Sequence, residues 1–378
     1  MIKNKKILIL INNLNFFISH RLLTAKASLA KGYKVVVGYG ELGGANIELL
    51  EQNGFTIEYI PMNRGGMNFF KELKTLFYIW KFFKKEKPDI IHLVTIKPYL
   101  YGGIISRLLG VTGLVSAVSG LGTLFINNDL KFRFLRILLF PFFKLAFNHN
   151  NQKVILQNHD DLKKLVDWGV LDSSNSILIK GSGVEIEKFT SLDEPAGLPT
   201  VCFASRLIRD KGVYEFVSAA SILRKRGVKA RFLLAGDLDA NNLTGLNIEE
   251  LKNLKKEGNI EVLGYQKDIP ILYSGSHIIC LPSYREGLPK SLIEAAAASR
   301  AIVTTDVPGC RDAIIPNKTG LLVPVKDSEK LADALQWLIE NPKERVQMGK
   351  AGRIYAEKEF TIDKISKKHL DVYKKLLN

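Results

Sequence analysis

The feature that most constrains the fold is a repeated alternation of two kinds of segment. Short, continuously apolar runs such as KILILIN (6–12) and DIIHLVT (89–95) alternate with amphipathic segments, several of which end in glycine. Continuously apolar strands are typical of parallel sheets that helices cover on both faces. The first half of the chain therefore predicts a doubly wound α/β domain.

The same alternation begins again in the second half, with apolar runs at 200–207, 230–237, 277–283 and 301–306. A chain of 378 residues is too long for one ordinary core. We therefore predict an α/β fold of two doubly wound parallel-sheet domains that face a central cleft. The less regular segment 184–199 is interpreted as a linker. In such sheets ligands bind at the carboxyl ends of the strands.

Composition narrows the setting of the protein. Three widely separated cysteines predict a reducing compartment and no disulfide framework. The basic and apolar N-terminus lacks a small-residue cleavage site, and no run approaches the ~20 apolar residues of a spanning helix. We therefore expect a cytoplasmic protein. Residues 1–180 hold 24 Lys and Arg against 12 Asp and Glu, so the N-terminal half should attract polyanions or anionic lipid.

Two glutamates flank a predicted helix start in SYREGLPKSLIEAAAA (283–298). Glu286 lies in a loop with Gly287 and Pro289, and Glu294 lies inside the helix that follows. The free N–H groups of Lys290 and Ser291 would favour a phosphate. A carboxylate can accept two hydrogen bonds from hydroxyls, so Glu294 suits a ribose diol and Glu286 suits a sugar. The alternative is a solvated loop acid and a helix acid that balances the dipole.

Two cations follow the strand at 200–207. Arg206 ends this strand, and Lys211 precedes Gly212 at the opening of the next helix. Cations beside a helix N-terminus at the carboxyl end of a sheet can clamp a diphosphate, although a solvated surface pair is the alternative. Gly236, Gly264 and Tyr265 follow two further strands, and their main chain could approach a nucleobase.

The segments SRLIRDKGV, LAGD, LGYQKDIPILYSGSHIICLPSYREGLPKSLIEAAAA and TTDVPGCRD together resemble the C-terminal domain of retaining GT-B glycosyltransferases of family four. The resemblance implies that Glu286 and Glu294 hold the donor sugar and the nucleotide ribose, and that Arg206 and Lys211 hold the diphosphate. It also implies which residues take part in catalysis, namely Glu286, Arg206 and Lys211. The residues implied to bind the nucleotide-sugar are Glu294, Gly236, Tyr265, Gly287, Leu288, Pro289 and Lys290. Neither a metal nor a cofactor is implied.

The N-terminal half is similar to bacterial transferases that act on undecaprenyl-diphosphate-linked acceptors in making O antigen, capsule or protein glycan. The segments that carry this likeness are FFISHRLLTAKASLAKGYKV, IKPYLYGGIISRLLG, AVSGLGTLF and VILQNHDDL. Two family features are missing: NNLNFF replaces the paired glycines after the first strand, and SGLG replaces a histidine. The acceptor-binding set would be His20, Lys97, Ser119, Gly120, Gly122 and Asn158. His20 is expected at the start of the first helix, where capping or packing is the alternative role.

The domains implied are 1–182 for the acceptor, 183–358 for the nucleotide-sugar, and a helix at 359–378 that crosses back to the N-terminal domain. The predicted activity is retaining transfer of N-acetylgalactosamine, or another hexosamine or hexose, from a UDP-sugar to an undecaprenyl-diphosphate-linked saccharide. This would occur at the inner face of the cytoplasmic membrane. Another lipid or core oligosaccharide acceptor is an alternative.

Other classes of function leave different signatures. A basic nucleic-acid-binding protein is the alternative from another class, although we expect no nucleic acid partner. An NAD oxidoreductase requires G-x-G-x-x-G after the first strand, which is absent from INNLNFF. Asp237 and Asp239 form a D-x-D pattern that can hold a metal elsewhere, but we interpret it as a loop.

Two aromatic and basic segments, 69–87 and 131–147, have the composition of helices that lie in a lipid headgroup region. The alternative is that both are ordinary sheet-covering helices, with Leu73, Leu76, Phe77 and Trp80 buried in the core. Pro141 should kink the second helix.

Overall fold

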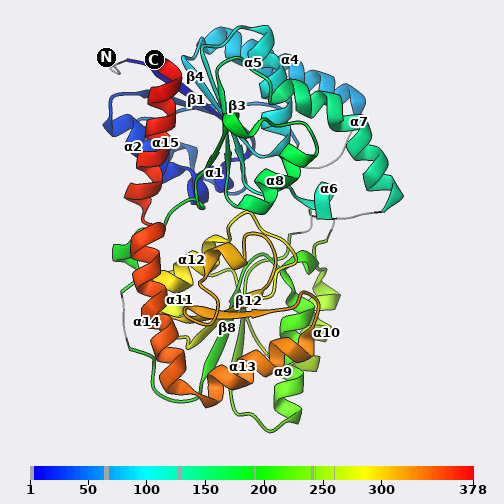
Figure 1. Ribbon diagram of the computed structural model, residues 1–378, viewed down its shortest axis with the longest axis vertical. Coiled ribbons are helices and arrows are strands. Elements are labelled where there is room, and N and C mark those ends of the chain that lie inside the picture. The colour runs from blue at the N-terminus through cyan, green and yellow to red at the C-terminus, as the bar shows by residue number, and fades with distance from the viewer. Residues whose placement is uncertain are drawn as a thin grey trace. The chain divides into compact units, whose positions relative to one another are not determined.

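The computed structural model describes residues 4–63, 68–126, 129–190, 193–239, 242, 244–258 and 260–378. The chain divides into two compact units (Figure 1). The first unit is Met1–Ser182 together with Ile362–Asn378, and the second is Gly183–Thr361. Each unit has its own hydrophobic core.

The first unit contains a sheet of seven strands in the order β3-β2-β1-β4-β5-β6-β7. Every neighbouring pair is parallel. The strands are β1 (Lys6–Asn13), β2 (Lys34–Glu41), β3 (Thr56–Tyr59), β4 (Ile90–Val94), β5 (Gly113–Val118), β6 (Gln152–Leu156) and β7 (Ser176–Leu178). The strand order reverses between β1 and β4, because β2 and β3 lie on one side of β1 and the later strands lie on the other. Open α/β sheets usually bind ligands at such a point.

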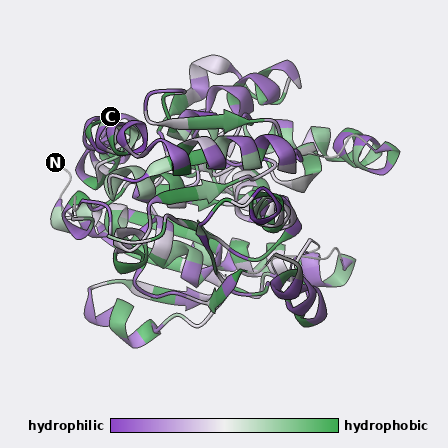
Figure 2. Cartoon of the chain, turned by 90° about the horizontal axis from the view of Figure 1, so that it is seen from below, coloured by the Kyte–Doolittle hydropathy of each residue, from purple (hydrophilic) through white to green (hydrophobic). Residues whose placement is uncertain are grey.

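Helices cover this sheet because its central strands are apolar on both faces. They are α1 (Leu14–His20), α2 (Leu22–Ala30), α3 (Ile47–Gln52), α4 (Phe69–Glu86), α5 (Gly103–Leu108), α6 (Thr123–Ile126), α7 (Leu130–Ala146), α8 (His159–Asp167) and α15 (Ile362–Leu377). Short helical turns are η1 (Pro98–Gly102) and η2 (Ser173–Asn175). Figure 2 shows mostly hydrophobic strands and helices of mixed hydropathy.

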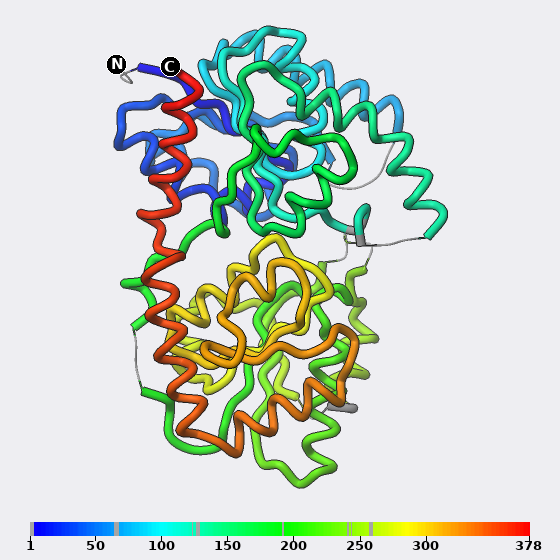
Figure 3. Tube along the Cα trace, in the orientation of Figure 1, coloured from blue at the N-terminus to red at the C-terminus, as the bar shows by residue number. Residues whose placement is uncertain are grey.

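The last helix joins the first unit. Helix α15 packs against α2, β4 and β5, so the red end of the chain lies beside its blue beginning (Figure 3). Its buried side chains include Ile365, Val372, Tyr373 and Leu376. The helix begins at Ile362, while Glu359 still belongs to α14.

The second unit contains a sheet of six parallel strands in the order β10-β9-β8-β11-β12-β13. The strands are β8 (Thr200–Ala204), β9 (Arg231–Ala235), β10 (Glu261–Gly264), β11 (Ile278–Leu281), β12 (Ala301–Thr305) and β13 (Gly320–Val323). Its strand order reverses between β8 and β11. The predicted fold class, two doubly wound parallel sheets, is therefore confirmed.

The helices of the second unit are α9 (Val213–Lys225), α10 (Ile248–Gly258), α11 (Ile269–Ser274), α12 (Lys290–Ala297), α13 (Ser328–Glu340) and α14 (Pro342–Glu359). Three 3₁₀ turns are η3 (Ile186–Lys188), η4 (Arg209–Lys211) and η5 (Arg311–Ala313). The interpretation of residues 184–199 as a linker is wrong at its start. Three of its side chains are buried in the core of this unit: Val184, Ile186 and Phe189.

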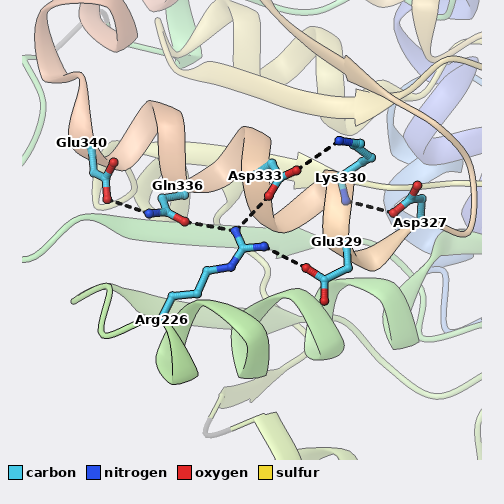
Figure 4. Close-up of polar contacts among 7 residues, drawn as sticks. All are labelled: Arg226, Asp327, Glu329, Lys330, Asp333, Gln336 and Glu340. Carbon is cyan, nitrogen blue, oxygen red and sulfur yellow. Dashed lines mark hydrogen bonds and ion pairs between the residues drawn. The ribbon is translucent and has the colours of Figure 1, made fainter.

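Helices α9 and α13 pack side by side, and a polar network at the surface joins them (Figure 4). Arg226, which caps α9, donates hydrogen bonds to Asp333 and Gln336 at 2.9 and 3.1 Å, and its other terminal nitrogen lies 2.8 Å from Glu329. Exposed ion pairs of this kind contribute about 0–1 kcal/mol each. The apolar packing beneath them holds the two helices together.

Helix α7 continues through Pro141 as one element, and the kink expected there stays a prediction. The alternative given for α4 is wrong. Its buried face is Thr75, Ile79, Phe82 and Phe83, whereas Leu73, Phe77 and Trp80 are exposed and Leu76 is only partly buried. The aromatic residues of α4 are numerous enough to form two faces, so the helical pattern alone did not identify the buried one.

Candidate active site

The centre of the candidate site lies where the strand order of the second sheet reverses. Lys211 belongs to η4 after β8, and Glu286 lies in the loop after β11, the strand beside β8. The ammonium group of Lys211 contacts Oε1 of Glu286, and the hydroxyl of Ser283 donates to the same oxygen at 2.8 Å. Both charged side chains are largely buried. The structure thus brings together two residues that lie 75 positions apart.

Backbone contacts fix the two loops that carry this pair. The hydroxyl of Ser283 also lies 3.0 Å from the carbonyl oxygen of Asp210, so its single proton is shared between this oxygen and Glu286. The N–H of Tyr284 donates to the same carbonyl at 2.8 Å. Gly212 has φ +76°, and a Cβ there would lie 2.1 Å from the carbonyl oxygen of Pro282. Glycine is therefore required for the loops to approach each other so closely.

A third loop supports Glu286 from the side of β12. The N–H of Glu286 donates to the carbonyl of Pro308 at 3.1 Å. Gly309 has φ +81°, and a Cβ there would lie 2.5 Å from the carbonyl oxygen of Glu286. Burial, with the nearby charge of Glu286, raises the pKa of the Cys310 thiol to about 12. Cys310 is therefore a packing residue and not a nucleophile at neutral pH.

The second glutamate lies on α12, which begins at Lys290 with Pro289 as its N-cap residue. Nζ of Lys290 lies 3.2 Å from Oε1 of Glu294. Burial raises the pKa of Glu294 above its ordinary value, and the charge of Lys290 opposes that shift. Gly287 and the buried Leu288 connect this helix to Glu286.

Glu294 and Lys290 border a small cavity within the second unit. The cavity measures about 140 Å³ and is lined by Gly183, Val184, Glu185, Lys188, Phe189, Lys267, Ile269, Pro270, Lys290 and Glu294. Polar and apolar side chains therefore meet beside a buried carboxylate, which is an arrangement that can bind a small polar ligand.

Arg206 lies further along the same edge of the sheet. Its guanidinium group lies 2.5 Å from a carboxylate oxygen of Asp239 and is about half exposed. One acid of the D-x-D pattern is therefore engaged with an arginine. The carbonyl of the other, Asp237, accepts a hydrogen bond from Leu207. Within the described residues, no group of three or more His, Cys, Asp and Glu side chains could hold a metal ion.

Gly236 and Gly264 occupy adjacent strand ends. The N–H of Gly236 donates to the carbonyl of Gly264 at 2.8 Å. Gly236 has φ +147°, and a Cβ there would lie 1.8 Å from the carbonyl oxygen of Ser205. Close backbone packing therefore explains this glycine. Tyr265, the next residue after β10, is exposed.

The predicted acceptor residues lie in the first unit. The expectation that His20 starts the first helix is wrong, because it is the last residue of α1. Its ring stacks on Phe16 with centroids 4.0 Å apart, and Nδ1 lies 2.7 Å from the hydroxyl of Ser19. The side chain of Arg21, which is buried, donates to the carbonyl of His20 at 3.0 Å and reaches Ser119 at 3.4 Å.

The other acceptor candidates have local roles that the structure defines. Nζ of Lys97 lies 2.6 Å from Glu72 of α4, and both side chains are largely buried. The side chain of Asn158 caps α8 by accepting from the N–H of Asp161 at 2.7 Å. Gly120 and Gly122 follow β5 with φ of +120° and +62°. The glycines, with Ser119, form the turn at the carboxyl end of that strand.

Comparison with known proteins identifies the family of this chain. A family described as "Glycosyl transferase 4-like" matches residues 6–158, and one described as "Glycosyl transferases group 1" matches residues 184–355. The chain belongs to the GT-B glycosyltransferases. The crystal structure of HepE from Anabaena with UDP-glucose has a TM-score of 0.78 at 18% identity and covers 98% of this chain and 99% of that chain.

Two curated relatives of this glycosyltransferase have names that describe sugar transfer to a saccharide linked to undecaprenol through a diphosphate. The N,N'-diacetylbacillosaminyl-diphospho-undecaprenol alpha-1,3-N-acetylgalactosaminyltransferase of Campylobacter jejuni is 29% identical over 314 residues, which are 80% of this chain and 81% of the relative. The UDP-Gal:alpha-D-GlcNAc-diphosphoundecaprenol alpha-1,3-galactosyltransferase of Escherichia coli is 25% identical over 73% of each chain.

Sequence reasoning missed several residues around the site of this glycosyltransferase. They include Ser283 and Asp210, which hold the Glu286 loop, and Lys188 and Lys267, which line the cavity beside Glu294. A hydroxyl three residues before a candidate acid was a usable signal for Ser283. Lys188 and Lys267 are far from Glu294 in sequence, and only folding places them near it.

Proposed function

We propose that this glycosyltransferase moves a sugar from a UDP-sugar to an undecaprenyl-diphosphate-linked saccharide, with retention of configuration. The proposed donor is UDP-N-acetylgalactosamine or a related hexosamine or hexose donor. The observation that carries the proposal is the pairing of Lys211 with Glu286 at the strand-order reversal of the second sheet, beside Lys290 and Glu294. The names of the Campylobacter and Escherichia relatives support the donor and acceptor classes.

The second unit is proposed to bind the donor. The buried carboxylate of Glu294 accepts both hydroxyls of the ribose, with the main chain of Gly236 and Tyr265 near the base. Lys211 and Arg206 bind the diphosphate together with the N–H groups at the start of α12. A diphosphate then competes with Glu286 and Asp239 for these cations. Glu286, released from Lys211, accepts hydrogen bonds from the sugar.

The reaction breaks the bond between the anomeric carbon and the diphosphate oxygen. Negative charge develops on the departing UDP, and Lys211, Arg206 and the α12 N–H groups stabilise it in place. The acceptor hydroxyl forms the new bond on the same face of the sugar, and its proton leaves with the diphosphate. No step in this scheme requires a metal ion.

The first unit is proposed to bind the acceptor. Ser119, Gly120 and Gly122 present backbone N–H groups at the end of β5, where a phosphate can bind. Lys97 and His20 are proposed to contact the acceptor diphosphate, and Asn158 to hold the α8 end of this surface. The reaction then takes place at the cytoplasmic face of the membrane that carries the lipid-linked acceptor.

The test is to incubate the protein with a panel of UDP-sugars and a synthetic prenyl-diphosphate disaccharide, and to measure product mass. We expect one UDP-sugar to add one sugar residue to the acceptor, and the product to keep the anomeric configuration of the donor by NMR. Retained activity in excess chelator checks the metal-free scheme. No mass increase with any donor, combined with no thermal stabilisation by UDP, would refute the proposal.

A further inference from the structure

The first unit exposes an unusual stripe of apolar side chains on α7. Leu130, Phe134, Ile137, Leu138, Phe142 and Leu145 recur at intervals that place them on one face of the helix. All six are exposed, with 69% of Phe134 and 72% of Ile137 accessible. The opposite face packs into the core through Phe143 and Ala146. A helix that only covers a sheet has a mainly polar outer face, whereas that of α7 is mainly apolar.

The charges on α7 frame this stripe. Lys131, Arg133 and Lys144 are exposed, while the helix contains no acidic residue. Counted around the helix, Lys131 lies near one edge of the stripe, between Leu138 and Phe142, and Arg133 and Lys144 lie just beyond the other edge. Long basic side chains can extend beside an apolar face and keep their charged ends at its border. The surface is therefore apolar in the middle and cationic at its rim.

Helix α4 repeats the same arrangement. Its outer face exposes Phe69, Phe70, Leu73, Phe77 and Trp80, opposite the buried Ile79 and Phe82. Lys71, Lys74 and Lys81 are exposed along one side. Lys84 lies within the aromatic face, with Nζ 4.8 Å from the centre of the Trp80 ring. Helices α4 and α7 both pack against α5 and η1 within the first unit (Figure 1).

We infer that the outer faces of α4 and α7 form a docking surface for an anionic lipid bilayer. Lys and Arg beside exposed Phe and Trp are suited to the headgroup region, where the rings enter the acyl boundary and the cations meet anionic lipid. Among the described residues, no helix is long and apolar enough to cross a membrane. This inference deepens the proposed function, because it places the acceptor-binding unit at the leaflet that holds a lipid-linked acceptor.

The test uses the full chain and vesicles without any sugar donor. We expect the protein to float with vesicles of equal phosphatidylcholine and phosphatidylglycerol, and to bind phosphatidylcholine vesicles about tenfold less tightly. The stripe variant Phe134→Ser/Ile137→Ser/Phe142→Ser should lose at least about tenfold in affinity for anionic vesicles. The charge variant Lys131→Glu/Arg133→Glu/Lys144→Glu should lose a similar factor and its salt dependence.

The second unit offers a matched control. Ile248→Ser/Trp337→Ser/Ile354→Ser removes three side chains that are 65%, 41% and 66% exposed, close to the 69%, 72% and 47% of the stripe variant. We expect this control to bind vesicles as the wild type does, with both variants unchanged in melting temperature.

Unchanged vesicle binding by the stripe variant would overturn the inference. A stripe variant that altered the oligomeric state and still bound vesicles would show that a second copy of the chain covers the stripe, and would also overturn it. Vesicle binding requires no catalysis, so its failure is distinguishable from failure of the proposed sugar transfer. Binding without any transfer would leave the surface in place and refute the proposed acceptor.

Discussion

Nδ1 of His92 lies 2.6 Å from the hydroxyl of Tyr373, which joins the central strand β4 to the last helix of the chain. Both side chains are fully buried. The ring of His92 stacks on that of His369 with centroids 5.8 Å apart, and Arg21 lies close enough for its charge to affect both imidazoles. Nε2 of each histidine is buried without a hydrogen-bond partner in the described part of the chain.

This cluster predicts a loss of stability in acid. Burial, reinforced by the charge of Arg21, lowers the pKa of His92 well below 6.5 and that of His369 to about 3. The unfolded chain then binds more protons, so the stabilisation is present above pH 6.5 and is lost as the pH falls toward 3. For one such histidine the loss at pH 5 is about 2 kcal/mol.

Urea unfolding at pH 7.5, 6, 5 and 4 measures this loss. His369→Gln should flatten the profile, while His159→Gln, at an exposed position, should leave it unchanged. Tyr373→Phe removes the hydrogen bond to His92 and should cost about 1 kcal/mol at pH 7.5. A wild-type profile that is flat from pH 7 to 4 would contradict the prediction.

Lys211→Met should lower kcat/KM by about 10²–10³, because it removes a cation proposed to stabilise the departing diphosphate. It also leaves the largely buried Glu286 without its cation, so the folded fraction must be measured beside the rate. Lys252→Met, at an exposed position of α10, is the control. Steady-state kinetics at a saturating acceptor concentration decides the outcome, and a rate equal to that of the control would exclude Lys211 from the site.

Glu294 should make UDP binding depend on pH. The ionised carboxylate is proposed to accept both ribose hydroxyls, and burial raises its pKa above the ordinary 4.5. UDP affinity should therefore increase as the pH rises through this raised pKa. Calorimetric titration of UDP between pH 4.5 and 7.5 measures the slope. Glu294→Gln should weaken binding by about 1.5–3 kcal/mol and remove the slope, and a slope that survives in this variant would assign it to another group.

Ser299→Gly should stabilise the second unit. Ser299 has φ +59°, a left-handed conformation that costs a residue with a side chain about 1–2 kcal/mol. The added chain flexibility of glycine offsets part of this gain, so we expect about 0.5–1 kcal/mol in thermal unfolding. Ser299→Val, whose branched side chain fits this conformation worse, should destabilise. A Gly variant less stable than the Val variant would contradict the prediction.

Members of the resembled family usually have glycine at the position of Ser299. The structure gives the reason, since the backbone at this position is left-handed. A dihedral angle leaves no trace in composition or periodicity, so it was not predictable from this one sequence.

The sequence by itself determined the fold class and the parts of the site that are local. Continuously apolar runs in alternation with amphipathic helices permit little other than covered parallel sheets. The positions of three site residues relative to the start of α12 could be predicted from helix geometry, because they are close along the chain. These residues are Glu286, Pro289 and Glu294. In the first unit, by contrast, a short helix that was not predicted, α1, precedes the expected one, and His20 is its last residue.

Only the tertiary structure decided which distant residues meet and which apolar faces are buried. The pairs Lys211 with Glu286 and Arg206 with Asp239, and the cavity beside Glu294, depend on strand order, which a single sequence does not encode locally. The tertiary structure also decided which face of α4 is buried, because its aromatic residues could have been buried on either side. Burial is a property of neighbours in space, and the packing of α5 and η1 selects the inner face and leaves Phe77 and Trp80 outside.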